Sequence, residues 1–239
     1  DRVPALDWQG RPYEPGDRPA AHPNARFTVS IRNCPSYTGE AEDPGGVPID
    51  AIIFGGRRAS LAPLVLEAED WEHGTFVGAA MASETTAAAT GQVGVVRRDP
   101  MAMKPFCGYH FGDYWAHWLD VGSRLAHPPK IFQVNWFRRD ADGGFVWPGF
   151  GENIRVLEWI LKRCAGEVDA RETPVGRLPR ADDIAIDGLP QRPDLETLTE
   201  FDADGWRVEL EHVREYLEGF QPRVPDSLIE RIRTIQRRL

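Results

Sequence analysis

A 19-residue segment, residues 135–153, holds the side chains best suited to bind an aromatic ligand. Its sequence, NWFRRDADGGFVWPGFGEN, places Phe137, Phe145 and Phe150 around a predicted turn. An aromatic ring stacks on a nucleobase for roughly 1–3 kcal/mol, and the amide of Asn153 adds donors and acceptors that can read a base. The segment indicates a base-binding pocket. A hydrophobic hairpin joined to a core helix explains the same pattern and stays open as the alternative.

A second group of candidates is FGGRR, residues 54–58, which ends an apolar run. Two glycines let the backbone turn sharply or approach a ligand closely. Arg57 and Arg58 carry guanidinium forks that match phosphate oxygens, and open α/β sheets bind ligands at strand ends. The pattern suggests a phosphate contact, although a turn with two solvated arginines accounts for it equally simply.

A third candidate is AHPNARF, residues 21–27. In an extended strand, Asn24 and Arg26 would point the same way. They would offer an amide and a guanidinium to an anionic substrate, whereas an ordinary polar edge is the alternative.

Residues 83–92 are small and polar, as in a loop that closes over a site as a lid. A static short helix or surface loop is the alternative. The residues of this predicted lid are Ser83, Glu84, Thr85, Thr86, Ala87, Ala88, Ala89, Thr90, Gly91 and Gln92.

Composition limits the partners. The net charge of −9 and the sequence pI near 5.2 argue against a nucleic acid or an anionic membrane as the main partner. Three cysteines without zinc-type spacing favour a reduced, cytoplasmic protein. No Gly-Lys dipeptide and no HExxH motif occur, so neither a Walker-type phosphate loop nor a metal site is predicted within this chain.

The helices and strands that must position these residues are predicted from Pro and Gly content and from the spacing of apolar residues. Residues 1–50 are rich in Pro and Gly, so no long helix is expected there. Short apolar runs in the remainder, 51–239, predict strands, and helical periodicity predicts helices. The predicted strands are 51–54, 63–68, 75–81 and 130–137; the predicted helices are 113–125, 153–165, 205–220 and 227–239. The fold class is mixed α/β, with an extended first segment and a larger second lobe.

Several strings keep one order along the chain: HPNARF, GVPIDAIIFGGRR, SETTAAA, RRDPMAMKPF, NWFRRDADGGFVWPGFGENIRVLEW and TPVGRLP. From about residue 6 onward the sequence resembles the GTP-dependent phosphoenolpyruvate carboxykinases. The aromatic segment favours the GTP-dependent class over the ATP-dependent one. The resemblance implies a mixed sheet with flanking helices, the carboxy-terminal lobe of that fold, incomplete because family enzymes are much longer.

The resemblance also implies roles. Substrate contacts fall on Asn24, Ala25 and Arg26, and the catalytic residues are Arg26 and Arg57. GTP contacts fall on Arg26, Arg57, Phe137, Phe145, Phe150, Gly151, Glu152 and Asn153. Ala25 stands where a serine is expected, and Thr85, Cys107 and His110 also depart from the family pattern.

The implied reaction converts oxaloacetate and GTP to phosphoenolpyruvate, GDP and CO2, a decarboxylating lyase step of gluconeogenesis. Mn2+ would be held by ligands in an absent amino-terminal part, and Mg2+ would accompany GTP. The complete enzyme is expected to be cytoplasmic and monomeric, without nucleic-acid or membrane partners. This chain alone is expected to have no turnover and to bind GTP weakly or not at all. A non-catalytic guanine-nucleotide-binding or interaction module derived from the lobe is the alternative.

Overall fold

The computed structural model describes residues 5–16, 18–22, 25, 28–85 and 94–239. It divides into two compact units, residues 1–48 with 85–95 and residues 49–84 with 96–239. The described part of the first unit holds one antiparallel strand pair and two 3-10 turns. These elements are β1 (Ala5–Leu6), β2 (Pro12–Tyr13), η1 (Ile31–Asn33) and η2 (Glu40–Glu42). No longer helix occurs among the described residues of 1–50, as the prolines predict.

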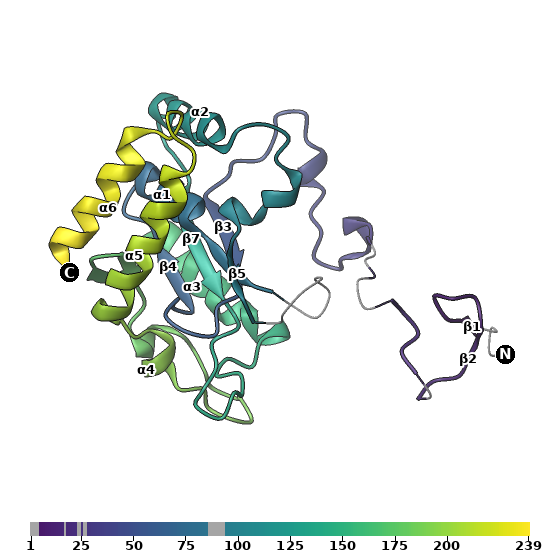
Figure 1. Ribbon diagram of the computed structural model, residues 1–239. Helices are drawn as coiled ribbons and strands as arrows, with labels where there is room; N and C mark the ends of the chain where they lie inside the picture. Colours follow the sequence, from purple (N-terminus) through teal and green to yellow (C-terminus); the bar gives the residue numbers. More distant parts are fainter. Residues whose placement is uncertain (1–4, 17, 23–24, 26–27, 86–93) are drawn as a thin grey trace. The chain divides into compact units, whose positions relative to one another are not determined.

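The second unit is built on a five-stranded sheet with the order β3-β7-β4-β9-β8 (Figure 1). Its strands are β3 (Ala51–Gly56), β7 (Lys130–Asn135), β4 (Val65–Glu67), β9 (Gly176–Leu178) and β8 (Arg171–Thr173). β3 and β7 run parallel, and the other pairs are antiparallel. The mixed sheet predicted from the sequence is confirmed. β3 forms one edge, and no described residue pairs with its outer side.

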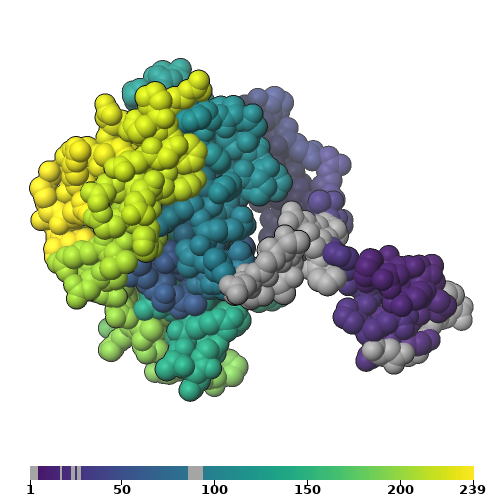
Figure 2. Space-filling model, viewed as in Figure 1, coloured from purple at the N-terminus to yellow at the C-terminus, as the bar shows by residue number. Residues whose placement is uncertain are grey.

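Helices cover both faces of this sheet (Figure 1). Along β7, Ile131 packs into one hydrophobic cluster while Phe132 and Val134 pack into the other, as alternation along a strand requires. The first cluster joins the sheet to α1 (Trp71–Ala80), α2 (Phe111–Arg124), α5 (Ala203–Glu218) and α6 (Asp226–Arg238). The second joins it to α3 (Asn153–Ala165) and α4 (Leu195–Leu198). In Figure 2 the surfaces of α5 and α6 lie side by side in green-yellow and yellow.

Residues 75–80 are helical and Met81 follows the helix in non-helical conformation, so the strand predicted over 75–81 is wrong. The helix is α1, and the Asp70 side chain caps it by accepting a hydrogen bond from the His73 N–H at 2.7 Å. The helix is buried on nearly every side, so its sequence shows no helical period. Gly74 allows the close approach to the sheet, because a Cβ there would lie 2.3 Å from the Ile131 Cδ1.

The other predicted helices are confirmed with small shifts. α2 begins two residues early because the His110 side chain accepts a hydrogen bond from the Gly112 N–H at 3.1 Å. α3 begins at Asn153 and ends at Gly166, which adopts φ 72°. α6 is preceded by Pro225, so neither Asp226 nor Ser227 caps it.

Two short strands, β5 (Ala82–Glu84) and β6 (Val96–Arg98), pair in antiparallel fashion on either side of residues 85–95. The remaining 3-10 turns are η3 (Pro100–Ala102), η4 (Lys104–Phe106), η5 (Phe150–Glu152) and η6 (Ala181–Asp183). In the described part of the chain, no helix is long and apolar enough to cross a membrane.

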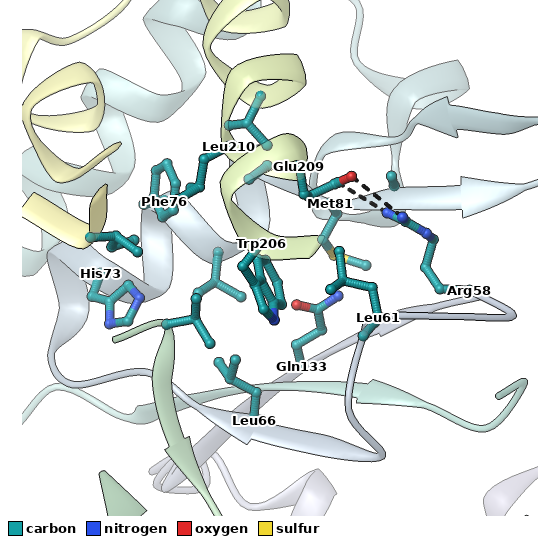
Figure 3. Close-up of a pocket in the computed structure, with 17 residues that line it drawn as sticks. Arg58, Leu61, Leu66, His73, Phe76, Met81, Gln133, Trp206, Glu209 and Leu210 are labelled. Carbon is teal, nitrogen blue, oxygen red and sulfur yellow. Dashed lines mark hydrogen bonds and ion pairs between the residues drawn. The ribbon is translucent and has the colours of Figure 1, made fainter. Parts of the chain in front are cut away.

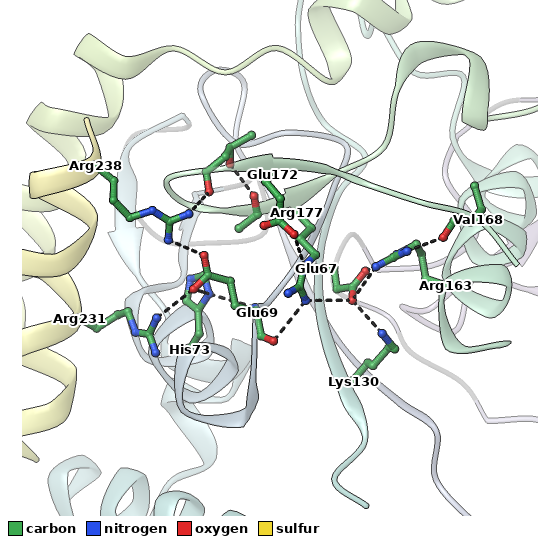
Figure 4. A network of polar contacts seen from close by, with 12 residues as sticks. Glu67, Glu69, His73, Lys130, Arg163, Val168, Glu172, Arg177, Arg231 and Arg238 are labelled. Atoms are coloured by element: carbon green, nitrogen blue, oxygen red, sulfur yellow. Dashed lines mark hydrogen bonds and ion pairs between the residues drawn. The ribbon is translucent and has the colours of Figure 1, made fainter. Parts of the chain in front are cut away.

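A charged network crosses the sheet at β4 (Figure 4). The Glu67 carboxylate is fully buried and contacts the side chains of Lys130, Arg163 and Arg177. Burial alone would raise the pKa of Glu67, but the hydrogen bonds and charges of Arg163 and Lys130 outweigh it and hold that pKa below its usual value. The network therefore fixes the start of β7 and the end of α3 to the sheet.

Candidate functional site

The site is built where the two parallel strands end. Gly56, the last residue of β3, pairs in register with Asn135, the last residue of β7. The FGGRR loop and the aromatic segment therefore leave the sheet from neighbouring positions at the same edge. In open α/β sheets this carboxyl edge is where ligands bind.

Every backbone N–H and C=O group of residues 57–59 makes a hydrogen bond. The N–H groups of residues 57, 58 and 59 donate to Ser83 Oγ (3.2 Å), Asn135 Oδ1 (3.0 Å) and Glu84 Oε1 (2.7 Å) respectively. The three carbonyl oxygens accept from the Glu84 N–H (2.7 Å), Asn135 Nδ2 (2.9 Å) and the Arg139 N–H (2.9 Å). The loop is thus joined to β5 on one side and to the aromatic segment on the other.

The side chain of Asn135 connects the FGGRR loop to the start of the aromatic segment. Its side chain is fully buried and also accepts a hydrogen bond from the Phe137 N–H at 3.3 Å and donates one to the Ala62 carbonyl at 3.0 Å. The sequence analysis did not single out Asn135. Its position as the last residue of a buried strand was the available signal, because a polar residue there must find partners.

The two arginines of FGGRR have different surroundings. Arg58 Nη1 lies 3.0 Å from Glu209 Oε1, and Arg98 Nη1 reaches the same oxygen at 2.8 Å. Burial alone would raise the pKa of Glu209, but the two guanidinium groups outweigh it and lower that pKa. Arg57 makes no ion pair with a described residue, and its buried Nε has no hydrogen-bond partner among them. Among the described residues, Arg58 is thus the arginine of this pair with a carboxylate partner and Arg57 is the one without.

The aromatic segment turns back on itself as a short hairpin. Arg139 and Phe145 form an isolated antiparallel bridge, and the Asp140 N–H donates to the Gly144 carbonyl at 2.9 Å. The rings of Phe137 and Phe145 meet edge to face, with centroids 5.9 Å apart. The Arg139 guanidinium lies over the Phe145 ring at 4.1 Å. These two rings lie together outside the core, and Phe145 is 54% exposed.

Phe150 lies in η5, immediately before α3, and its side chain is 98% exposed. Its backbone has φ 46°, and Gly149 before it has φ 70°. A non-glycine residue in this region costs roughly 1–3 kcal/mol, which is why such residues concentrate at functional sites. Within η5, Gly151 is exposed, and Glu152 pairs with Arg155 at 2.6 Å.

Asn153 is oriented by a residue that the sequence analysis missed. The indole N–H of Trp147, which is 1% exposed, donates to Asn153 Oδ1 at 2.9 Å. An indole N–H can only donate, so the amide oxygen faces Trp147 and the NH2 group points elsewhere. No described residue accepts a hydrogen bond from that NH2 group.

Part of the predicted site lies outside the described residues. Asn24, Arg26 and residues 86–92 of the predicted lid are among these. Ala25 is exposed, and its N–H donates to the His22 carbonyl at 2.8 Å. Ser83 and Glu84 lie in β5, and Thr85 follows them. The assignments at all of these positions stay predictions.

A cavity of about 700 Å³ lined by Arg58, Arg98 and Arg138 borders both the FGGRR loop and the aromatic segment. Two further cavities lie near these segments. One, of about 540 Å³, lies between Phe145 on the hairpin and Asp194 before α4. The other lies between the sheet and helices α1 and α5, with mostly apolar walls and the Arg58–Glu209 pair at one end (Figure 3). Its walls include none of the residues assigned to GTP.

Metal ligands do not gather in the described part of the chain. No group of three His, Cys, Asp or Glu side chains there has the arrangement that a metal ion needs. The described residues alone therefore do not fit a resident Mn2+ or Mg2+.

A protein-family comparison and a search of known proteins both match this chain to phosphoenolpyruvate carboxykinases. Residues 2–238 match the family described as the phosphoenolpyruvate carboxykinase C-terminal P-loop domain. The chain is 50% identical over 241 residues to a phosphoenolpyruvate carboxykinase [GTP] from Anaeromyxobacter dehalogenans strain 2CP-1, covering 97% of this chain and 40% of the relative. Relatives of the same name from Chlamydia muridarum and Thermoplasma volcanium are 48% and 47% identical, each over 98% of this chain and 39% of their own length. The chain spans about two fifths of the length of these relatives.

Proposed function

Since this chain belongs to the GTP-dependent phosphoenolpyruvate carboxykinase family, of which it matches the carboxy-terminal domain, we propose that it supplies the guanine pocket and a phosphate-binding arginine of such an enzyme. The complete enzyme would interconvert oxaloacetate plus GTP with phosphoenolpyruvate, GDP and CO2. The single observation that carries this proposal is the shared carboxyl edge of β3 and β7. There Arg57, which has no ion pair with a described residue, and the segment that carries the exposed Phe145 and Phe150 leave the sheet from neighbouring strands.

The base would bind against the phenylalanine rings. Phe137 and Phe145 already contact each other, and the exposed ring of Phe150 has a face available for stacking. The backbone of Gly151 and Glu152 and the NH2 group of Asn153 would supply the hydrogen-bonding edge.

Arg57 would contact the nucleotide phosphates. A guanidinium group binds phosphate oxygens in bidentate geometry and neutralises charge that develops during phosphoryl transfer. Arg26 would act with it near the transferred phosphoryl group, and Asn24 and Ala25 would hold the substrate. Residues 83–92 would close as a lid, excluding water and protecting the enolate that decarboxylation leaves.

Metal chemistry would come from outside this chain. Mn2+ would stabilise the enolate and Mg2+ would accompany GTP, each held by residues beyond these 239. This chain's own residues would bind the base, orient the phosphates and exclude water. We further propose a cytoplasmic, monomeric enzyme that takes part in gluconeogenesis.

The test is Phe150→Ala in the complete enzyme, with GDP affinity measured by calorimetry. We expect a loss of about 10-fold or more, the factor that corresponds to a lost stacking contact. Leu161→Ala on α3 is the control, because Leu161 is an exposed apolar side chain of the same unit at 65% exposure. Unchanged GDP affinity in Phe150→Ala would refute the pocket assignment.

A second candidate is a non-catalytic guanine-nucleotide-binding or interaction module. The observation that favours it is the span of only two fifths of the relatives' length. The reading frame upstream of residue 1 separates the two. A Gly-Lys phosphate loop with metal-binding residues in that frame would support the enzyme, and their absence would support the module.

A further inference from the structure

The inference concerns the choice of base, and it rests on the proposed function. A pocket of phenylalanine rings binds any nucleobase, because every base has a π face. Selection of guanine needs a polar group whose direction is fixed. Among the described residues assigned to the base, Asn153 has the side chain that can do this, provided that its two ends cannot exchange places.

A free asparagine amide does not discriminate between purines at the 6-position. Guanine presents an acceptor there, O6, whereas adenine presents a donor, the N6 amino group. An amide that rotates by half a turn about its side-chain axis offers NH2 to one base and C=O to the other. Discrimination therefore depends on what holds the amide.

In this structure a buried indole holds it. Trp147 is 1% exposed and lies in the hydrophobic cluster on the α3 face of the sheet. Its Nε1–H donates to Asn153 Oδ1 at 2.9 Å. Rotation of the amide would place NH2 against the indole N–H, two donors facing each other, and would leave a buried N–H without an acceptor. A buried donor without an acceptor loses its hydration and gains nothing in return, which disfavours the rotated amide.

We infer that Trp147 is a specificity-determining positioning residue: by fixing the Asn153 oxygen, it directs the Asn153 NH2 group toward the base and so favours a 6-oxopurine over adenine. Trp147 does not touch the base itself. Loss of Trp147 should therefore change the ratio of the affinities for GDP and ADP, and should have little effect on the affinity for nucleotides in general.

Trp147→Phe is the first variant, because it keeps an aromatic ring in the cluster and removes the donor; the accompanying loss of ring volume is matched by a control. In the complete enzyme, equilibrium affinities are measured for GDP, IDP and ADP. We expect the preference for GDP over ADP to fall about fivefold, the factor corresponding to the typical net contribution of one hydrogen bond. IDP has O6 but no 2-amino group, so its preference over ADP should fall with that of GDP.

Trp159→Phe is the matched control. Trp159 belongs to the same cluster, is also 1% exposed, and its Nε1 has no hydrogen-bond partner among the described residues. This substitution loosens the same packing and removes an indole N–H, but breaks no hydrogen bond. The preference for GDP over ADP should be unchanged. An equal fall in both variants would assign the effect to packing and overturn the inference.

Asn153→Asp gives a test that does not depend on the folding of Trp147→Phe. The carboxylate keeps an acceptor for Trp147 and replaces the outward NH2 with oxygen, so the preference for GDP should be lost. If Asn153→Asp or Trp147→Phe kept the preference for GDP over ADP, the inference would be overturned. A fall in the preference for GDP over ADP without a fall in the preference for IDP over ADP would also overturn it. A wild-type enzyme with no preference for GDP over ADP would instead refute the proposed function, and the inference with it.

Discussion

At the scale of single residues, a buried carboxylate connects several elements of the second unit through ion pairs. Glu67 is the clearest case, because a fully buried carboxylate joins cations from β7, α3 and β9 (Figure 4). Buried ion pairs gain little when they form, but removal of one partner leaves the others buried without compensation. The stability of the unit therefore depends on Glu67 more than on any exposed ion pair.

Glu67→Ala should lower the free energy of unfolding by about 3–5 kcal/mol, since it leaves Lys130, Arg163 and Arg177 without their shared carboxylate. Urea denaturation monitored by tryptophan fluorescence measures this change. Glu172→Ala is the control, because Glu172 is an exposed partner of Arg177 and its loss should cost less than about 1 kcal/mol. Equal effects of the two substitutions would contradict this account of the network.

His73 gives the protein a pH dependence in mildly acidic solution. Burial, with a further contribution from the charge of Arg231, lowers the pKa of His73 from 6.5 to about 4. The Glu69 N–H donates to its Nδ1 at 3.1 Å, which requires the neutral ring. The unfolded chain therefore takes up a proton before the folded protein does, and stability falls as pH decreases from about 6.5 toward 4.

The expected loss across that interval is about 3 kcal/mol, since each pKa unit corresponds to about 1.4 kcal/mol. Urea denaturation at pH 7, 6 and 5 measures about half of it and stays above the ordinary pKa values of carboxylates. The variant His73→Gln should lack this slope. A wild-type stability that is constant between pH 7 and 5 would show that His73 is not buried in neutral form.

At the scale of elements, the loop between β3 and β4 is coupled to β5 through side-chain hydrogen bonds. Glu84 makes two of these contacts, because its carboxylate accepts from the Ala59 N–H and its own N–H donates to the Arg57 carbonyl, and Ser83 Oγ accepts from the Arg57 N–H. Arg57 thus sits on backbone fixed by the strand that leads into the predicted lid.

Glu84→Ala should speed hydrogen exchange at the Ala59 amide about fivefold, as expected for the loss of about 1 kcal/mol. Glu84→Gln keeps an acceptor oxygen and should retain most of the protection. Asp183→Ala removes a comparable carboxylate that accepts from the Arg180 N–H at 2.8 Å, and it should leave Ala59 unaffected. Unaltered exchange at Ala59 in Glu84→Ala would show that the loop does not need this contact.

Elements with clear periodicity are predicted from the sequence, whereas α1 is mistaken for a strand and the short elements β5, β6, β8, β9 and α4 are not predicted. α3 was predicted because its apolar residues recur at helical spacing before Gly166. α1 was taken for a strand because its buried surface extends nearly all round, which leaves a continuous apolar run. The cap at Asp70 was the available signal. The position of Asn135 at the end of a buried strand signals that it needs partners, but those partners are set by tertiary contacts. The Trp147–Asn153 hydrogen bond depends on how the turn before α3 folds, which the sequence does not show.

At the scale of the whole molecule, the proposed function assigns to this chain one part of a nucleotide site. The proposed base pocket and Arg57 lie within it, whereas no Gly-Lys phosphate loop occurs in its sequence. We therefore expect the purified 239-residue chain to show no manganese-dependent carboxykinase turnover. A coupled assay for phosphoenolpyruvate formation measures this, and activity above the buffer blank would contradict the proposed division of the site.

The outer edge of β3 determines where additional chain would complete that site. Its six residues, AIIFGG, carry no charge and no proline, and their outward backbone groups can accept another strand. A strand that joined in parallel there would end beside Gly56, so its following loop would emerge next to Arg57. A loop that followed such a strand would lie near Arg57 and near the segment that leaves β7, which are the residues proposed to bind the phosphates and the base.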